Sequence, residues 1–190
     1  IANNIFDNCI QYAQPGYIYL LSSHAHTIIQ GNIFKRTDTS LPDAYGISVS
    51  SGWHDNDVII ANNRFIGNGP EGNFSGVSAG YHFYILCSNN MFKSLQNGIL
   101  INNTYHSTFS GNRFLSCNKS FANVPNISFA GEDVLVCNNV TTGTVDSYDL
   151  YMRQNENGTH PPLSWTVTNN VFSKSVKFTH NVGGTPCKNI

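Results

Sequence analysis

The chain has 190 residues, of which 40% are apolar and only 11% are charged, and its formal net charge is −1. This composition excludes a disordered chain and argues against a nucleic-acid binder that works through bulk electrostatics. No apolar run approaches the roughly 18 residues of a membrane span, so we expect no membrane insertion. The polar surface must come from neutral groups, above all the 26 asparagines.

Seven similar strings follow one another along the chain. Each has Asn or Gly followed by an Asn that we call the anchor, and six of the seven have Phe two residues after the anchor. In chain order the anchors are Asn4, Asn32, Asn63, Asn90, Asn112, Asn139 and Asn170. The interval between successive anchors is shortest from Asn90 to Asn112 and longest from Asn32 to Asn63 and from Asn139 to Asn170. Such a variable period suits a coil whose strands are fixed and whose loops differ in length.

The columns around the anchor support a coil. The residue three before the anchor is apolar in every repeat: Ile1, Ile29, Ile60, Cys87, Phe109, Val136 and Val167. In a parallel coil, equivalent residues lie about 4.8 Å apart above one another. Apolar columns then form a core, and the Asn column forms a hydrogen-bonded ladder at a tight bend. Asn also tolerates the left-handed backbone that such bends use.

A second strand is expected upstream of each anchor, in the first part of each repeat, where apolar and polar residues alternate. The alternation is clear near Ile18, Ile47, Ile99 and Leu150 and weaker near Val77 and Phe121. No segment shows sustained helical periodicity. These patterns predict an all-β fold, a right-handed parallel β-helix of about seven coils with an Asn ladder, in which residues 1–190 form one domain. A β-sandwich is the alternative, but it would not explain one string recurring in the same form.

Five cysteines, Cys9, Cys87, Cys117, Cys137 and Cys187, show no paired or metal-finger spacing. An odd number cannot pair fully, so we expect buried free thiols, which fits folding in a reducing compartment. The chain begins with isoleucine and shows no signal peptide. We therefore expect a fragment of a longer chain, or a processed product.

Histidine and aromatic residues gather between the second strand and the anchor. An aromatic residue precedes a histidine in three consecutive repeats, and we place these pairs at corresponding levels: Trp53-His54, Tyr81-His82 and Tyr105-His106. The position six residues before the anchor holds, in turn, His26, Asp57, Tyr84, His106, Asp133 and Ser164. This register predicts a line of titratable groups along one edge of the coil.

Three interpretations of this edge remain open. The residues can be turn formers whose rings fill gaps between coils. They can form a sugar-binding face, on which the aromatic residues stack against pyranose rings and their histidine neighbours bond hydroxyl groups. They can bind a metal through stacked histidines, but ligands on a ladder rarely converge on one point. We expect no metal and no cofactor.

The candidate catalytic acids are Asp55, Asp57, Glu71 and Asp133, with Glu132 and Glu156 also credible. Glycoside hydrolysis needs two carboxyl groups about 5 to 9.5 Å apart. Asp55 and Asp57 are near in sequence but can point to different faces, and Asp57 and Asp133 lie about three rungs apart, which is too far on simple stacking.

Two arginines, Arg64 and Arg113, directly follow their anchors two repeats apart. A lyase needs a base near a uronate and a neutralising cation, so both are candidates for contact with an anionic glycan. Both can equally be ordinary surface arginines.

The Ile-x-x-Asn-x-Phe pattern, repeated in coils of variable length from Ile1 to about Phe178, resembles the pectate-lyase-like β-helix superfamily. With its free cysteines and Asn-rich surface, the chain looks most like a bacteriophage tailspike or tail-fibre β-helix. That resemblance implies a homotrimer in the virion tail, outside the cell, that recognises and often cleaves bacterial surface polysaccharide.

The resemblance does not supply catalytic residues. The paired-Asp and His-Gly motifs of polygalacturonases and the Asp-Pro-His motif of mannuronan epimerases are not found in this sequence. The alternatives are therefore a secreted bacterial lyase or epimerase of the same class, and a non-catalytic adhesive β-helix.

Overall fold

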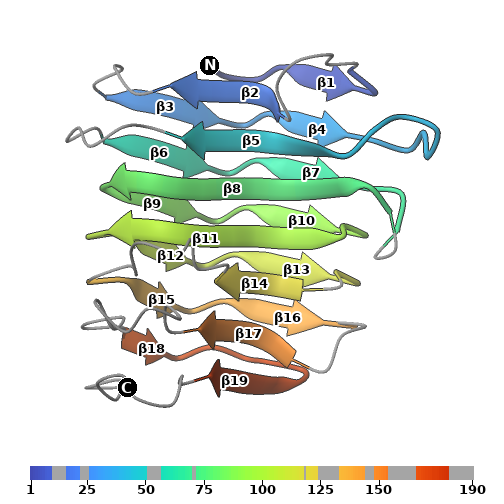
Figure 1. Ribbon diagram of the computed structural model, residues 1–190. Helices are drawn as coiled ribbons and strands as arrows, with labels where there is room; N and C mark the ends of the chain where they lie inside the picture. The colour runs from blue at the N-terminus through green and yellow to red at the C-terminus, as the bar shows by residue number, and fades with distance from the viewer. Residues whose placement is uncertain are drawn as a thin grey trace.

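The computed structural model describes residues 1–9, 16–21, 26–50, 57–69, 72–117, 119–123, 133–143, 148–153 and 166–179. In these ranges the regular structure is all β, and the strands pair in parallel throughout (Figure 1). No helix in this described part of the chain is long and apolar enough to cross a membrane.

The strands form three sheets that run the length of the stack. Sheet A contains β3 (Thr27–Gln30), β6 (Val58–Ala61), β9 (Ile85–Ser88), β12 (Thr108–Ser110), β15 (Leu135–Cys137) and β18 (Thr166–Thr168). Sheet B contains β1 (Ile5–Asp7), β4 (Ile33–Lys35), β7 (Arg64–Ile66), β10 (Met91–Lys93), β13 (Arg113–Leu115) and β16 (Val140–Thr142). Sheet C contains β2 (Gly16–Leu21), β5 (Ala44–Ser50), β8 (Phe74–Phe83), β11 (Asn97–Tyr105), β14 (Lys119–Asn123), β17 (Tyr148–Arg153) and β19 (Ser175–Thr179).

Each coil passes from a strand of sheet C to one of sheet A, then to one of sheet B. In Figure 1 the strands of sheet C run to the left in front, and those of sheets A and B run to the right behind them as the chain descends, so the winding is right-handed. The predicted parallel β-helix is confirmed. Within the described residues, sheets B, C and A hold six, seven and six strands. The predicted count of about seven coils therefore agrees with sheet C and differs by one from sheets A and B.

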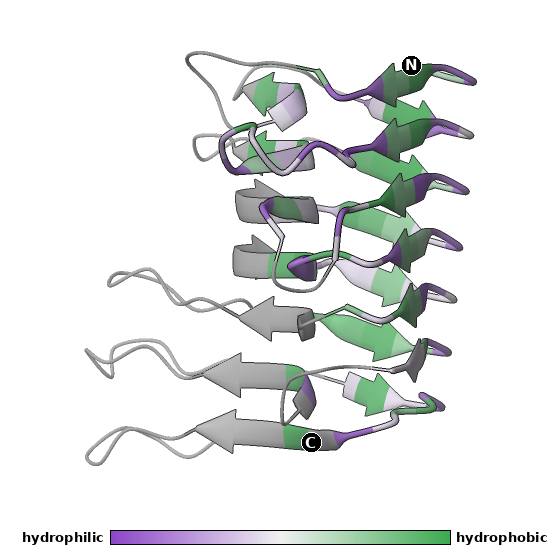
Figure 2. Cartoon of the chain, turned by 90° about the vertical axis from the view of Figure 1, so that its right-hand side faces the viewer, coloured by the Kyte–Doolittle hydropathy of each residue, from purple (hydrophilic) through white to green (hydrophobic). Residues whose placement is uncertain are grey.

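The anchor asparagines form the predicted ladder at the bend between sheets A and B. Each anchor side-chain Nδ2 donates to the Oδ1 of the next anchor, at 2.9–3.2 Å, from Asn4 through to Asn170. The backbone N–H of each anchor donates to the same oxygen at 2.9–3.0 Å. The Nδ2 groups also donate to carbonyl groups of the preceding coil, such as that of Ile60 from Asn90, at 2.9 Å. In Figure 2 these bends form the hydrophilic column at one edge of the stack.

The left-handed residue of this bend is the one directly before the anchor. Its φ lies between 53° and 66° in every coil, at Asn3, Gly31, Asn62, Asn89, Gly111, Asn138 and Asn169. Gly and Asn adopt this conformation at low cost, which explains why no other residue type occurs there.

The apolar columns fill the interior as predicted. The phenylalanines two residues after the anchor stack with their rings 4.8–4.9 Å apart, from Phe6 to Phe114. The column three residues before the anchor is fully buried from Ile29 to Val136. Within it, the burial of Cys87 raises the pKa of its thiol. Cys87 and Cys117 are buried free thiols, whereas Cys9 and Cys137 are free but partly exposed, so the expectation of buried thiols holds for two of these four.

The strand near Val77, which the sequence indicates weakly, is the longest in the structure, the ten-residue β8. Its glycines interrupt the alternation of apolar and polar side chains by which a strand is predicted. A Cβ atom on Gly76 would lie 2.5 Å from Cδ1 of Phe92, and one on Gly46 would lie 2.6 Å from Cδ1 of Phe65. Sheet C approaches the phenylalanine column so closely that only glycine fits.

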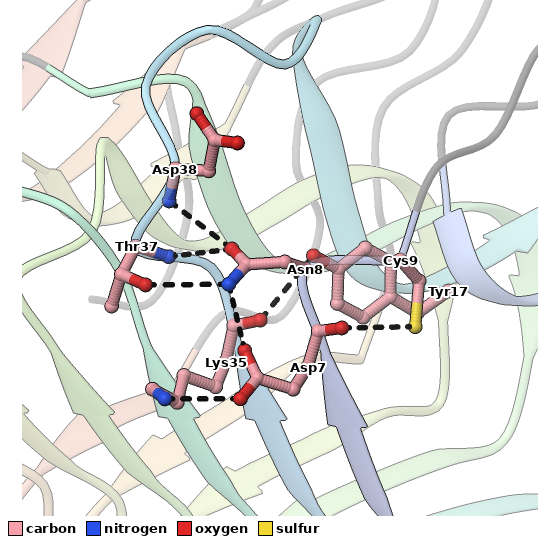
Figure 3. Close-up of polar contacts among 7 residues, drawn as sticks. All are labelled: Asp7, Asn8, Cys9, Tyr17, Lys35, Thr37 and Asp38. Atoms are coloured by element: carbon pink, nitrogen blue, oxygen red, sulfur yellow. Dashed lines mark hydrogen bonds and ion pairs between the residues drawn. The ribbon is translucent and has the colours of Figure 1, made fainter.

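A polar cluster holds the bend that follows sheet B in the first two coils (Figure 3). Asn8 Oδ1 accepts from the backbone N–H groups of Thr37 and Asp38, at 2.9 and 3.1 Å. Lys35 Nζ pairs with Asp7 Oδ2 at 3.0 Å. These side chains use their polar groups to tie one coil to the next, so they have a structural explanation.

Arg36 is buried next to this cluster, with 1% of its surface exposed. Its guanidinium donates to the carbonyl groups of Cys9 and Pro42 and to the Tyr17 hydroxyl. Burial raises the pKa of Tyr17, against the opposing effect of the Arg36 charge. Arg36 therefore closes the bend with carbonyl partners, and none of the described carboxylates pairs with it.

Candidate functional site

The residues six before the anchor form a line at the corner where sheet C passes to sheet A. We call this line the C–A corner; its described members are His26, Asp57, Tyr84, His106 and Asp133. Each lies just before a strand of sheet A, and backbone hydrogen bonds join successive coils there, as from Val58 N–H to the Tyr84 carbonyl at 3.0 Å. The predicted register of this edge is confirmed, and Ser164 lies outside the described residues.

Neighbouring side chains of the C–A corner interact in pairs. His26 Nδ1 lies 3.0 Å from Asp57 Oδ2, and His106 Nδ1 lies 3.1 Å from Asp133 Oδ2. The Tyr84 and His106 rings stack with their centroids 5.5 Å apart and their planes at 20°. Five successive coils therefore present, in order, an imidazole, a carboxylate, a phenol, an imidazole and a carboxylate.

The backbone of this corner is strained. His26, Tyr84, His106 and Asp133 have φ values of 57°, 58°, 48° and 51°. A left-handed conformation costs an ordinary L-residue about 1–2 kcal/mol. Strain of this kind gathers at functional sites, where the side chain matters more than its backbone cost.

An open groove of about 330 Å³ runs beside the middle of the corner. It is lined by Asp57, Ile59, Tyr84, Ile85, Leu86, His106 and Thr108. Ile59, Leu86 and Thr108 are paired in register on the outer face of sheet A. Tyr84 is 44% exposed and Leu86 is 38% exposed, so the groove has an apolar floor with one aromatic ring available to a ligand.

Part of the predicted site falls within this arrangement. Of the candidate residues, Asp57, His106 and Asp133 lie along the C–A corner, and of these three His106 and Asp133 contact each other. Asp57 and Asp133 belong to coils three rungs apart, and the spacing of about 4.8 Å per rung separates them by roughly 14 Å. That exceeds the separation that paired glycosidase carboxyl groups require, so these two acids do not form a hydrolytic pair.

The remaining candidates are not tested by the geometry. Trp53, His54, Asp55 and Glu71 lie outside the described residues, as do the side chains of Tyr81, His82 and Tyr105. Their roles stay predictions.

The aromatic–histidine pairs do not occupy corresponding levels, contrary to the sequence prediction. β8 and β11 pair in a register that places Phe83 opposite Tyr105. Tyr81-His82 therefore lies two residues earlier in its coil than Tyr105 and its histidine. The neighbour of His106 is Tyr84. The prediction failed because Tyr81 stands two residues farther from its anchor, Asn90, than Tyr105 stands from Asn112.

Arg64 and Arg113 lie on another side of the molecule. Both are exposed on the outer face of sheet B, in register with Met91 between them. The Asn ladder separates this sheet from sheet A. The two arginines share one column, as their sequence spacing indicates, but the structure does not bring them to the groove.

The groove floor contains residues that the sequence interpretation missed. Ile59 and Leu86 each stand beside a buried core residue, Ile60 or Cys87, so each strand shows adjacent apolar residues where alternation would place a polar one. That break in alternation was the available signal.

No group of three or more His, Cys, Asp or Glu side chains in the described ranges is placed to hold a metal ion. Comparison of the chain with protein-family models, curated proteins and solved structures returned no match. The fold therefore defines the class, a parallel β-solenoid, and the geometry of the groove carries the functional argument.

Proposed function

We propose that this β-helix binds a bacterial surface polysaccharide in the groove beside the C–A corner. The exposed Tyr84 ring, stacked on His106 above an apolar floor, carries the proposal. An aromatic ring offers a flat apolar surface to one face of a pyranose, and nearby polar groups bond its hydroxyls. Asp57, His106 and Thr108 supply such groups around the ring.

The repeat of the scaffold matches the repeat of the proposed ligand. The groove borders three consecutive strands of sheet A, β6, β9 and β12. One rung of about 4.8 Å is close to the length of one sugar unit, so a chain lying along the axis places about three units in the groove. An open groove that borders successive coils suits a polymer better than a small molecule.

The finer identity is also part of the proposal. The Asn ladder and phenylalanine column, in coils whose loops vary in length, support a pectate-lyase-like β-helix, most like a phage tailspike or tail-fibre domain. Such a protein works outside the cell, in the virion tail, as a homotrimer. A secreted lyase or epimerase would share the scaffold; a virion-attachment domain elsewhere in the gene product favours the tailspike, and a secretion signal favours the enzyme.

The test of binding is a single substitution with a matched control. Tyr84→Ala should weaken binding to a responsive surface polysaccharide by roughly two- to tenfold, because a stacked ring contributes about 0.5–1.5 kcal/mol. Tyr19→Ala removes a partly exposed tyrosine from sheet C and should leave binding unchanged. Affinity electrophoresis against a panel of purified capsules and lipopolysaccharides measures both. Equal losses from the two variants, or binding that survives Tyr84→Ala, would reject the groove.

Cleavage of the bound polysaccharide is a second candidate function, favoured by the His106–Asp133 pair. An imidazole oriented by a carboxylate is a common general acid–base arrangement. Asp133→Asn should then abolish release of reducing ends while binding persists. An adhesive β-helix without activity would show binding and no reducing-end release from any polysaccharide that it retains.

A further inference from the structure

We infer that the groove takes uncharged sugar units and discriminates against carboxylated ones. The inference rests on the proposed function, because it specifies the polysaccharide that the same groove binds. It goes beyond that function by naming a substrate class and the residue that sets it.

The permanent charges of the described residues around the groove all have one sign. Among its described lining residues, Asp57 carries the permanent charge, and no lysine or arginine lines the groove. Asp133 lies directly beyond His106 on the next coil. A chain that follows the axis therefore meets a carboxylate before the Tyr84–His106 platform and another after it.

The histidines add no permanent positive charge. An imidazole carries a positive charge only when protonated. His26 and His106 each direct Nδ1 at a carboxylate, at 3.0 and 3.1 Å. Such contacts orient the carboxylates without requiring an imidazolium, since a neutral ring donates from Nδ1 when that nitrogen carries its proton.

The cations are placed elsewhere. Arg64, Lys93 and Arg113 are exposed on three consecutive strands of sheet B, and none of the three forms an ion pair with a described carboxylate. Sheet B faces another direction from sheet A across the Asn ladder. No described cation is positioned to neutralise a uronate in the groove.

Like charges brought together in binding disfavour the wrong ligand. A uronate chain would place its carboxylates near Asp57 and Asp133. A neutral chain would place hydroxyl groups there instead, and these can donate hydrogen bonds to the two carboxylates. A neutral chain also lacks the acidified proton that β-elimination removes. Cleavage of such a chain by β-elimination is therefore not expected in this groove.

The experiment compares hexasaccharides that differ only in oxidation at C6: 1,4-linked galactose against galacturonate, mannose against mannuronate, and glucose against glucuronate. Dissociation constants are measured by NMR titration at pH 7.5 for the wild-type chain and for Tyr84→Ala. We expect at least one neutral hexamer to bind in a Tyr84-dependent way, with its uronate partner weaker by about tenfold or more.

The outcomes separate the two levels of the proposal. Tyr84-dependent binding of a uronate as tight as its neutral partner would overturn the inference and leave the proposed function standing. Binding of no hexamer, or binding that Tyr84→Ala does not weaken, would overturn the proposed function as well.

A charge-removing pair of variants tests the specificity residue itself. Asp57→Asn should tighten binding of the uronate hexamer, relative to binding of the neutral hexamer, by about threefold or more, since it removes the repulsion and keeps the shape. Asp43→Asn makes the same change in net charge at an exposed position between β4 and β5, away from the groove. An equal gain from both variants would mean that bulk charge sets the preference, and would reject Asp57 as its cause.

Discussion

The bend between sheets A and B and the C–A corner are opposite solutions to the same geometric task. At the first, every coil uses the same residue: the anchors from Asn32 to Asn139 are 0–1% exposed and bond one another. At the second, the residue changes from coil to coil, and the side chains of His26 and Asp133 are 78% and 49% exposed. Repetition with burial marks the scaffold, and variation with exposure marks the site that it holds.

Backbone conformation sharpens this contrast. Both bends use left-handed residues, but the bend between sheets A and B fills that position with Asn or Gly, and the C–A corner uses His, Tyr and Asp. The corner therefore accepts a conformational cost that the other bend avoids. The side chains at the corner must contribute something other than an easy turn.

The largest effect is expected from breaking the ladder in its middle, at Asn90. Asn90→Leu removes the acceptor of the Asn63 backbone N–H and Nδ2, and the donor to Ile60 O and Asn112 Oδ1. Because these partners are buried, the loss should reduce the free energy of unfolding by on the order of 4 kcal/mol. Urea denaturation measures the change.

The control for the ladder is the neighbouring residue. Asn89 is exposed and left-handed, with φ of 54°, so Asn89→Gly preserves the backbone and should alter stability by less than about 0.5 kcal/mol. A small effect of Asn90→Leu, comparable with that of Asn89→Gly, would show that burial and repetition do not mark the scaffold.

The next effect concerns the close approach of sheet C to the phenylalanine column. Gly76→Ala places a methyl group 2.5 Å from Cδ1 of Phe92 and 2.5 Å from the Gly98 carbonyl oxygen. Overpacking of this kind should destabilise the fold by about 1–3 kcal/mol. Thermal denaturation measures it, with Ser78→Ala on the same strand as the control. A Tm equal to that of the control would mean that the phenylalanine column shifts to accommodate the methyl group at little cost in stability.

The sequence predicted the repeated parts of the fold well because each depends on interactions within a single column of equivalent residues. The anchor string, the core residue before it and the phenylalanine after it depend only on stacking like on like, so the register of seven coils was readable. The glycines of β8 were not readable, because Gly76 is required by a ring on a different strand, Phe92. Close approach between sheets leaves no periodic signal.

The candidate site was predicted only in part, for the same reason. Counting from the anchor placed Asp57, Tyr84 and His106 in one line, since that distance is fixed by a single short strand of sheet A. Aligning Tyr81-His82 with Tyr105-His106 failed, because the first pair stands two residues farther from its anchor than the second. The groove floor, with Leu86, depends on which side of sheet A remains uncovered, and no single coil encodes that.

The buried thiols of the interior should make the free energy of unfolding depend on pH. Burial raises the pKa of Cys87 and raises that of Cys117 to about 12. In the unfolded chain a thiol ionises near its usual pKa of 9.0, whereas in the folded protein it stays protonated at that pH. The contribution of each thiol to stability is therefore full below about pH 9 and is lost as the pH rises towards the pKa of the folded state. Between pH 8 and pH 10 the free energy of unfolding should fall by about 1.4 kcal/mol for each thiol.

The contribution of one thiol is tested by comparing the decrease between pH 8 and pH 10 in a Cys87 variant with that in the wild type. Cys87→Val keeps an apolar side chain in the column and should remove that thiol's share of the decrease, whatever its effect on stability at pH 8. Urea denaturation at the two pH values gives the difference. An unchanged decrease in Cys87→Val would assign the alkaline effect to other groups, such as tyrosines.

The smallest and most selective effect compares two replacements of Tyr84. Alanine and glycine both remove the ring that stacks on His106, but only glycine relieves the left-handed backbone at φ of 58°. Tyr84→Gly should therefore be more stable than Tyr84→Ala by about 1 kcal/mol, while both lose polysaccharide binding to the same extent. Denaturation and affinity electrophoresis on the same samples separate the two properties. If the glycine variant were the less stable one, the corner would not be strained, and its departure from Asn and Gly would need no functional cause. If it bound as tightly as the wild type, the ring would be a turn residue after all, and the contrast between the two bends would concern folding alone.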